Sequence, residues 1–142
     1  MSAAPTPEHN KSIVRRAIDE IWNKGNMAVV EEIYDANCVR HDPATPNLET
    51  GLDNLKQQAA LYRAAFPDLH ITIEDIIVEG EKVVTRWSSR GTHKGELQGI
   101  APTGKEINSS GISISVITNG KIVEERVNWD NFGLMKQLGA IE

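Results

Sequence analysis

The spacing of apolar residues divides the chain into a helical first half and an extended second half. Thr6-Pro7 is a typical helix start, because a threonine hydroxyl accepts from an early helix N–H and proline suits the first helical position. Apolar residues then recur at helical spacing as far as Trp22, and Gly25-Asn26 marks the end of that helix. Residues 29–34 predict a short second helix.

A third helix is predicted over residues 52–66, and Pro67 ends it. From His70 the apolar period changes from 3.6 to 2, which is typical of strands. The predicted strands cover residues 70–78, 83–92, 107–117 and 121–130. Asn119-Gly120 predicts a tight hairpin before the last strand, because both residues tolerate positive φ. Helices followed by an antiparallel meander indicate an α+β fold, with residues 1–142 as one domain and 1–9 as a flexible tail.

Composition and charge narrow the classes of partner. The chain has 15 Lys and Arg against 20 Asp and Glu, and the basic residues are not clustered, which argues against nucleic acid and against an anionic membrane surface. Cys38 is the only cysteine and follows an apolar helical stretch, so buried packing is favoured over a reactive thiol. The polar first ten residues lack a signal-peptide core, and we expect a soluble, cytoplasmic protein.

Asp130 is the first candidate for chemistry, because it ends the last predicted strand. A carboxylate in an apolar pocket has its pKa raised and can exchange protons near neutral pH. The alternative is a solvated strand-end aspartate or a cap of the last helix. Alternation places Asp130 and Asn128 on one face of the strand and Val127 and Trp129 on the other. Asp130 therefore enters a pocket only if the polar face lines it, with the Val/Trp face on a partner subunit, or if a bulge re-aims the side chain.

His93 ends an earlier predicted strand, where it could polarise a carbonyl or orient a substrate, or simply bond to local backbone groups. His41-Asp42 forms a second polar pair in a brief extended piece over 39–43. The histidines lack HxxxH or HxH spacing, and there is no CxxC pair, which argues against a metal site. Tyr62 and Phe66 lie one turn apart on the third helix, as core or as pocket wall.

Several short segments follow one another in a specific order. They are Glu20-Ile21-Trp22-Asn23, Val39-Arg40-His41-Asp42-Pro43, Ala65-Phe66-Pro67-Asp68-Leu69, Arg90-Gly91-Thr92-His93, Pro102-Thr103-Gly104, Gly120-Lys121-Ile122-Val123-Glu124, Trp129-Asp130 and Gln137-Leu138-Gly139. Together they resemble the SnoaL-like polyketide cyclase (ester cyclase) family of the NTF2-like superfamily. The resemblance implies a cystatin-like cone, in which N-terminal helices pack on a strongly curved antiparallel sheet. It also implies oligomers built through the sheet, as dimers or tetramers.

The resemblance further implies an enzyme that uses no cofactor and cyclises or isomerises a hydrophobic, aromatic, polyketide-like carbonyl compound. The family's acid/base aspartate falls on Asp130 and the histidine of its Gly-Thr-His segment on His93. Asp130 would remove the proton α to an ester and later protonate the new alkoxide, while His93, His41 and Asn128 would hold the enolate or ketone oxygen. The residues expected to clamp a flat substrate are Trp87, Tyr62, Phe66 and Leu97.

Other functions fit the same sequence. A non-catalytic protein could bind small molecules in the same cavity. A dimerisation module would have a filled cavity and an apolar outer sheet face that carries Val123, Val127 and Trp129. A water-activating epoxide or ester hydrolase would gather Asp130, His93 and His41 around one water. The fold class by itself does not choose among these functions.

Overall fold

The computed structural model describes residues 6–44 and 51–141. Its helices are α1 (Pro7–Ala17), the π-helix η1 (Ile18–Asn23), the 3-10 helix η2 (Met27–Val29), α2 (Val30–Ile33), α3 (Leu52–Ala65) and α4 (Asn131–Gln137). Its strands are β1 (Tyr34–His41), β2 (His70–Glu79), β3 (Lys82–Thr92), β4 (Glu106–Thr118) and β5 (Lys121–Trp129). The predicted α+β class is confirmed.

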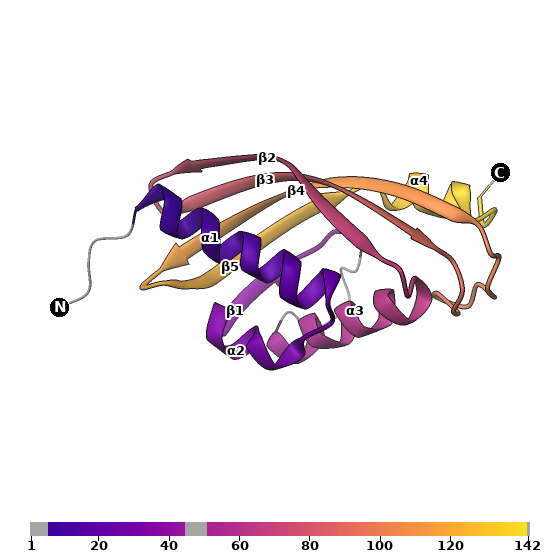
Figure 1. Ribbon diagram of the computed structural model, residues 1–142, viewed down its shortest axis with the longest axis horizontal. Coiled ribbons are helices and arrows are strands. Elements are labelled where there is room, and N and C mark those ends of the chain that lie inside the picture. The colour runs from indigo at the N-terminus through magenta and orange to yellow at the C-terminus, as the bar shows by residue number, and fades with distance from the viewer. Residues whose placement is uncertain (1–5, 45–50, 142) are drawn as a thin grey trace.

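The strands form one curved sheet in the order β1-β5-β4-β3-β2, and α1, α2 and α3 lie on one side of it (Figure 1). Strands β2 to β5 make the predicted antiparallel meander. Asn119 and Gly120 have φ angles of 53° and 77°, as their hairpin requires. Strand β1 departs from the prediction, because Tyr34 begins a strand that pairs in parallel with β5 rather than ending a helix.

The N-terminal helix begins as its sequence predicts. The Thr6 hydroxyl accepts from the His9 backbone N–H at 3.1 Å, and Pro7 is the first helical residue. Residues 7–9 of the predicted tail are therefore helical, and residues 1–5 lie outside the described residues. The helix ends in the π-helix η1, where the Asn23 amide bonds the backbone of Ile71 and joins the helix to β2.

The middle of strand β4 has an inverted pattern: between the buried Ile107 and Ile117, its small residues face the helices and its isoleucines face outward. Ser113 and Ser115 alternate with Ile112 and Ile114, which are 49% and 37% exposed. Gly111, on the inner face, lies between Trp87 and Trp129 in the cross-strand register. A Cβ atom there would lie 2.8 Å from the Trp129 Cβ and closer still to the Trp87 ring. The inner face of β4 thus leaves room that larger side chains would fill.

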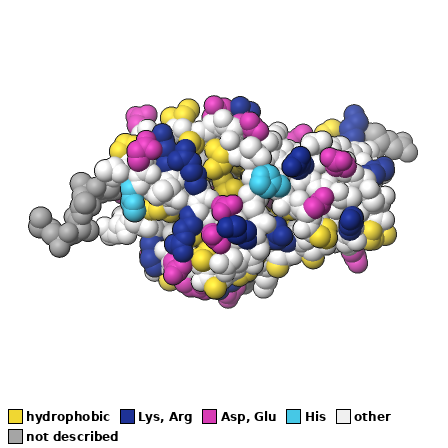
Figure 2. All heavy atoms as spheres, viewed as in Figure 1, with side chains coloured by type: hydrophobic (Ala, Val, Ile, Leu, Met, Phe, Trp, Pro, Cys, Tyr) yellow, Lys and Arg dark blue, Asp and Glu magenta, His cyan; other side chains and the backbone are white. Residues whose placement is uncertain are grey.

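Two apolar clusters make the core. One gathers residues of α1, α2 and β1 around Ile21 and Ile33, and the other joins Phe66 to Leu97 and Leu134. Within the described ranges, no helix is long and apolar enough to cross a membrane. Figure 2 shows acidic and basic side chains intermixed on the face in view.

We predict that Gly111→Ala destabilises the protein by about 1–3 kcal/mol, because the added methyl group must displace one of two tryptophans. Urea unfolding, followed by circular dichroism, measures this change. Gly51→Ala is the matched control, since no atom of the described residues lies within 4 Å of a Cβ there, and we expect a change below about 1 kcal/mol. Equal stability of the two variants would contradict the role of Gly111.

Candidate functional site

A cavity of about 110 Å³ lies between the helices and the sheet. The chain has three Trp, two Tyr and two Phe residues, and all of them except Phe132 line this cavity. The aromatic lining residues are Trp22, Tyr34, Tyr62, Phe66, Trp87 and Trp129. Apolar aromatic walls with a few polar groups are typical of small-molecule sites.

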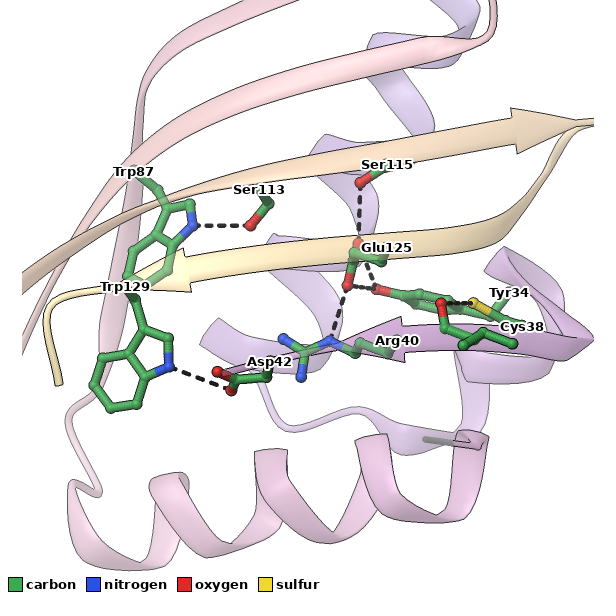
Figure 3. A network of polar contacts seen from close by, with 10 residues as sticks. Tyr34, Cys38, Arg40, Asp42, Trp87, Ser113, Ser115, Glu125 and Trp129 are labelled. Atoms are coloured by element: carbon green, nitrogen blue, oxygen red, sulfur yellow. Dashed lines mark hydrogen bonds and ion pairs between the residues drawn. The ribbon is translucent and has the colours of Figure 1, made fainter. Parts of the chain in front are cut away.

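The sheet supplies a floor of small hydroxyl side chains. Ser109, Ser113 and Ser115 come from the inner face of β4, and Ser89 comes from β3. The Trp87 indole N–H donates to the Ser113 hydroxyl at 3.1 Å, which fixes the ring against the floor (Figure 3). The cavity therefore combines wide aromatic surfaces with a polar floor.

A buried ion pair stands at one end of the cavity. The Arg40 Nε–H donates to Glu125 Oε1 at 3.0 Å, and the hydroxyls of Ser115 and Tyr34 donate to the same carboxylate at 3.0 Å and at 3.3–3.4 Å (Figure 3). Burial lowers the pKa of Arg40, but Glu125 and Tyr34 more than offset that effect and the net shift is upward. Burial also raises the pKa of Tyr34 well above its ordinary range, with Glu125 as a second cause. Glu125 is thus held by three donors, and Arg40 stays charged.

Asp42 is the second carboxylate of the cavity. Its Oδ2 accepts from the Trp129 indole N–H at 3.3 Å, and its Oδ1 accepts from the Ala44 backbone N–H at 2.9 Å. Within residues 6–44 and 51–141, no Lys, Arg or His nitrogen lies within 4.0 Å of this carboxylate. Figure 3 shows the Arg40 guanidinium between Glu125 and Asp42. Asp42 is oriented by neutral donors and is not neutralised by a paired cation.

Tyr62 lies beside Asp42 on the helical wall of the cavity. Its ring meets the Trp129 ring edge-on, with centroids 5.8 Å apart and planes at 90°. Burial, with the Asp42 carboxylate as a second cause, raises the pKa of Tyr62 to about 12. The buried hydroxyl has no hydrogen-bond partner in the part of the chain that the structure describes. Tyr62 thus offers a neutral hydroxyl near the carboxylate.

The structure places Asp130 outside the cavity lining. Its exposed side chain caps α4 and accepts from the Gly133 backbone N–H at 2.8 Å. The Val127 and Trp129 face of β5 lines the cavity instead, so Asp130 and Asn128 lie on the opposite side of the strand. No bulge re-aims Asp130, because the register from Gly111–Trp129 back to Val116–Glu124 is regular. The prediction that Val127 and Trp129 form part of an apolar outer face of the sheet is therefore wrong.

His93 also lies outside the cavity lining. The residue is fully buried, its Nδ1 accepts from the Thr103 backbone N–H at 3.2 Å, and its ring centroid is 5.5 Å from that of Phe66. Leu97 packs in the same apolar cluster, and His41 lies between two lining residues without lining the cavity itself. The structure does not bring His93, His41 and Asp130 together around one space.

Of the residues expected to contact substrate, Trp87, Tyr62 and Phe66 line the cavity. The sequence analysis gave Arg40 and Glu125 no part in a site, and it named Asp42 only as a member of the polar pair His41-Asp42. The alternation of small residues along Ser109, Gly111, Ser113 and Ser115 was a signal for a cavity floor. Cys38 is buried as predicted, and burial, followed by Glu125, raises its pKa to about 12. No group of three His, Cys, Asp or Glu side chains in the described ranges is arranged to hold a metal ion.

Residues 12–138 match the family model described as SnoaL-like polyketide cyclase. Because this match spans most of the chain, the chain belongs to the SnoaL-like polyketide cyclase family. No curated protein sequence is significantly similar to the chain.

Solved structures agree with this family. A candidate polyketide cyclase from Bacillus cereus is 30% identical, with a TM-score of 0.80, and the match covers 94% of this chain and 83% of that one. IdmH from Streptomyces antibioticus, also described as a candidate polyketide cyclase, is 28% identical, with a TM-score of 0.81 and coverage of 92% and 98%. A SnoaL-like protein from a Jannaschia species, 23% identical with a TM-score of 0.85 and coverage of 100% and 99%, shares the fold.

Proposed function

We propose that the protein catalyses proton transfer on a hydrophobic carbonyl compound in the aromatic cavity, as a cyclase or isomerase that acts by acid/base chemistry. The observation that carries this proposal is the oriented carboxylate of Asp42, which forms no ion pair among the described residues and faces the guanidinium of Arg40. Relatives named as polyketide cyclases support a substrate of that kind.

In this proposal Asp42 is the general base. Two of its lone pairs accept from Trp129 and Ala44, and within the described residues the others have no donor and are available to take a proton from the carbon α to a carbonyl. The terminal N–H groups of Arg40 stabilise the negative charge that then develops on the carbonyl oxygen. The neutral Tyr62 hydroxyl is a further donor near the same place.

The remaining steps follow from the same groups. The enolate carbon attacks a ketone of the same molecule, one carbon–carbon bond forms, and the ketone oxygen becomes an alkoxide. Protonated Asp42 returns its proton to that alkoxide, so the product is an isomer of the substrate and no cofactor is consumed. Asp130 and His93, which the resemblance implied for these roles, have no part in this proposal because they do not line the cavity.

We predict that Asp42→Asn slows deuterium exchange at the benzylic α-carbon of 2-tetralone about 100-fold or more, because the general base is lost. Proton NMR in D₂O measures the exchange rate, and tryptophan fluorescence measures binding of the ketone, since all three Trp residues line the cavity.

Asp130→Asn is the matched control, because asparagine caps helices as well as aspartate does and α4 is preserved. We expect that variant to keep the wild-type exchange rate. A loss of exchange in Asp130→Asn, with none in Asp42→Asn, would restore Asp130 as the base. Binding without exchange in the wild-type protein would instead support the non-catalytic carrier.

We also propose that the chain self-associates through the outer face of the sheet. Ile77 on β2 is 62% exposed and lies in register with Val84, which is opposite Ile114 on β4. The ion pairs Arg86–Asp75 and Arg126–Glu124 flank this apolar row. Apolar residues framed by both signs of charge suit an isologous contact between two copies of one chain.

We predict that Ile114→Lys shifts the protein to a monomer, because two buried copies of a lysine would face one another across the contact. Analytical ultracentrifugation measures the mass. Phe132→Lys is the control, since Phe132 is 61% exposed but lies on α4 and not on a strand of the sheet. A wild-type monomer, or an oligomer that Ile114→Lys leaves intact, would refute the contact.

A further inference from the structure

We propose that the cavity recognises two neighbouring oxygen atoms of its ligand, as in a 1,3-dicarbonyl compound, and that the terminal N–H groups of Arg40 are the donors. This inference rests on the function proposed above and names the class of substrate. It depends on two features of Arg40: its guanidinium has N–H donors without an acceptor in the described residues, and it is held in one orientation.

Arg40 has more donors than the protein uses. A guanidinium carries five N–H donors, and within the described ranges only the Nε–H has an acceptor, Glu125. The side chain is 14% exposed and lines the cavity, so most of its surface is withdrawn from water. The terminal donors belong to a side chain that lines the cavity, so a ligand there is in the position to accept from them.

The guanidinium is also held in one orientation. The Arg40 Nε–H donates to Glu125, and the Glu125 carboxylate also accepts from the hydroxyls of Tyr34 and Ser115. The Trp22 ring lies 5.6 Å from the Arg40 Cζ and packs against the guanidinium. Since Nε is bound to Glu125, the Nη groups are left for the ligand, and Figure 3 shows them between Glu125 and Asp42. A fixed planar fork binds two adjacent oxygens better than one.

Charge in the cavity favours a neutral pair of oxygens over a carboxylate. Among the lining residues, Asp42 and Glu125 carry negative charge and Arg40 alone carries positive charge. A carboxylate ligand would add a third negative charge to one guanidinium in a poorly hydrated space. A 1,3-dicarbonyl compound presents the same two acceptors without that charge.

The position of Asp42 gives a second reason to expect a 1,3-dicarbonyl ligand. Arg40 and Asp42 are two residues apart, and both line the cavity. The carbon between two carbonyl groups is a much stronger acid than the carbon beside one, so a carboxylate is an adequate base for it. In such a ligand, Arg40 would donate to the two carbonyl oxygens and Asp42 would take a proton from the carbon between them.

The test uses three probes with one bicyclic body: 2-acetyl-1-tetralone as the 1,3-dicarbonyl compound, 1-tetralone as the single ketone and 1,2,3,4-tetrahydro-2-naphthoate as the carboxylate. Isothermal titration calorimetry measures their Kd values. We expect the wild-type protein to bind the dicarbonyl probe at least about tenfold more tightly than either other probe. The single ketone lacks the second charge-assisted hydrogen bond to Arg40, and the carboxylate adds a third negative charge to the cavity. In Arg40→Lys, which keeps a positive charge beside Glu125, we expect that preference to fall below about threefold.

Arg86→Lys is the matched control, because Arg86 makes an exposed ion pair with Asp75 outside the cavity. It should keep the wild-type preference. Equal binding of the two ketones by the wild-type protein, tightest binding of the carboxylate, or no binding of any probe would overturn the inference, and so would a preference that survives in Arg40→Lys. The proposed function fails separately, if Asp42→Asn keeps its exchange of 2-tetralone while the preference for the dicarbonyl probe stands.

Discussion

The small side chains on the inner face of β4 are the constraint on which the rest of the site depends. A sheet that packs against helices normally places its bulk on that side. Here serines and Gly111 occupy the middle of that face, where core residues would stand, while Ile112 and Ile114 face outward. The space left over admits Trp87 and Trp129 from the neighbouring strands. The cavity and the apolar outer face are therefore two consequences of one alternation.

The buried pair of Arg40 and Glu125 gives that cavity its polar end. Withdrawal of two charges from water costs several kcal/mol for each ion, which mutual attraction and extra hydrogen bonds only roughly offset. The hydroxyls of Tyr34 and Ser115 supply such bonds. The pair contributes little net stability, but it holds a charged guanidinium in an aromatic space. Asp42, held by Trp129, faces the same space, so the polar groups are placed before any ligand arrives.

Local signals in the sequence predicted much of the fold. Thr6-Pro7 begins α1 and Asn119-Gly120 turns the last hairpin, because both depend on groups a few residues apart. The parallel pairing of β1 with β5 was not predicted, since it joins segments more than 80 residues apart and leaves no local mark. For the same reason Arg40 and Glu125, which meet across that pairing, were missed.

The alternation along β5 was predicted correctly, but it did not reveal that Asp130 caps α4. Alternation along β5 correctly separated Asp130 and Asn128 from Val127 and Trp129. The side of the sheet that each face occupies depends on where the helices pack, which the alternation does not contain. Because the helices cover the Val127 face, Asp130 is left to cap α4. The resemblance to the family predicted the fold well, whereas the transfer of catalytic roles to single positions was not supported by the cavity.

The most direct test of this account is a crystal structure of the protein with 2-acetyl-1-tetralone. The account predicts both ligand oxygens at about 2.7–3.2 Å from the Arg40 Nη atoms, the ring system against Trp87 and Trp129, and the Asp42 carboxylate facing the carbon between the two carbonyls. A ligand bound outside the cavity, or one whose reactive carbon faces Asp130 or His93, would contradict it.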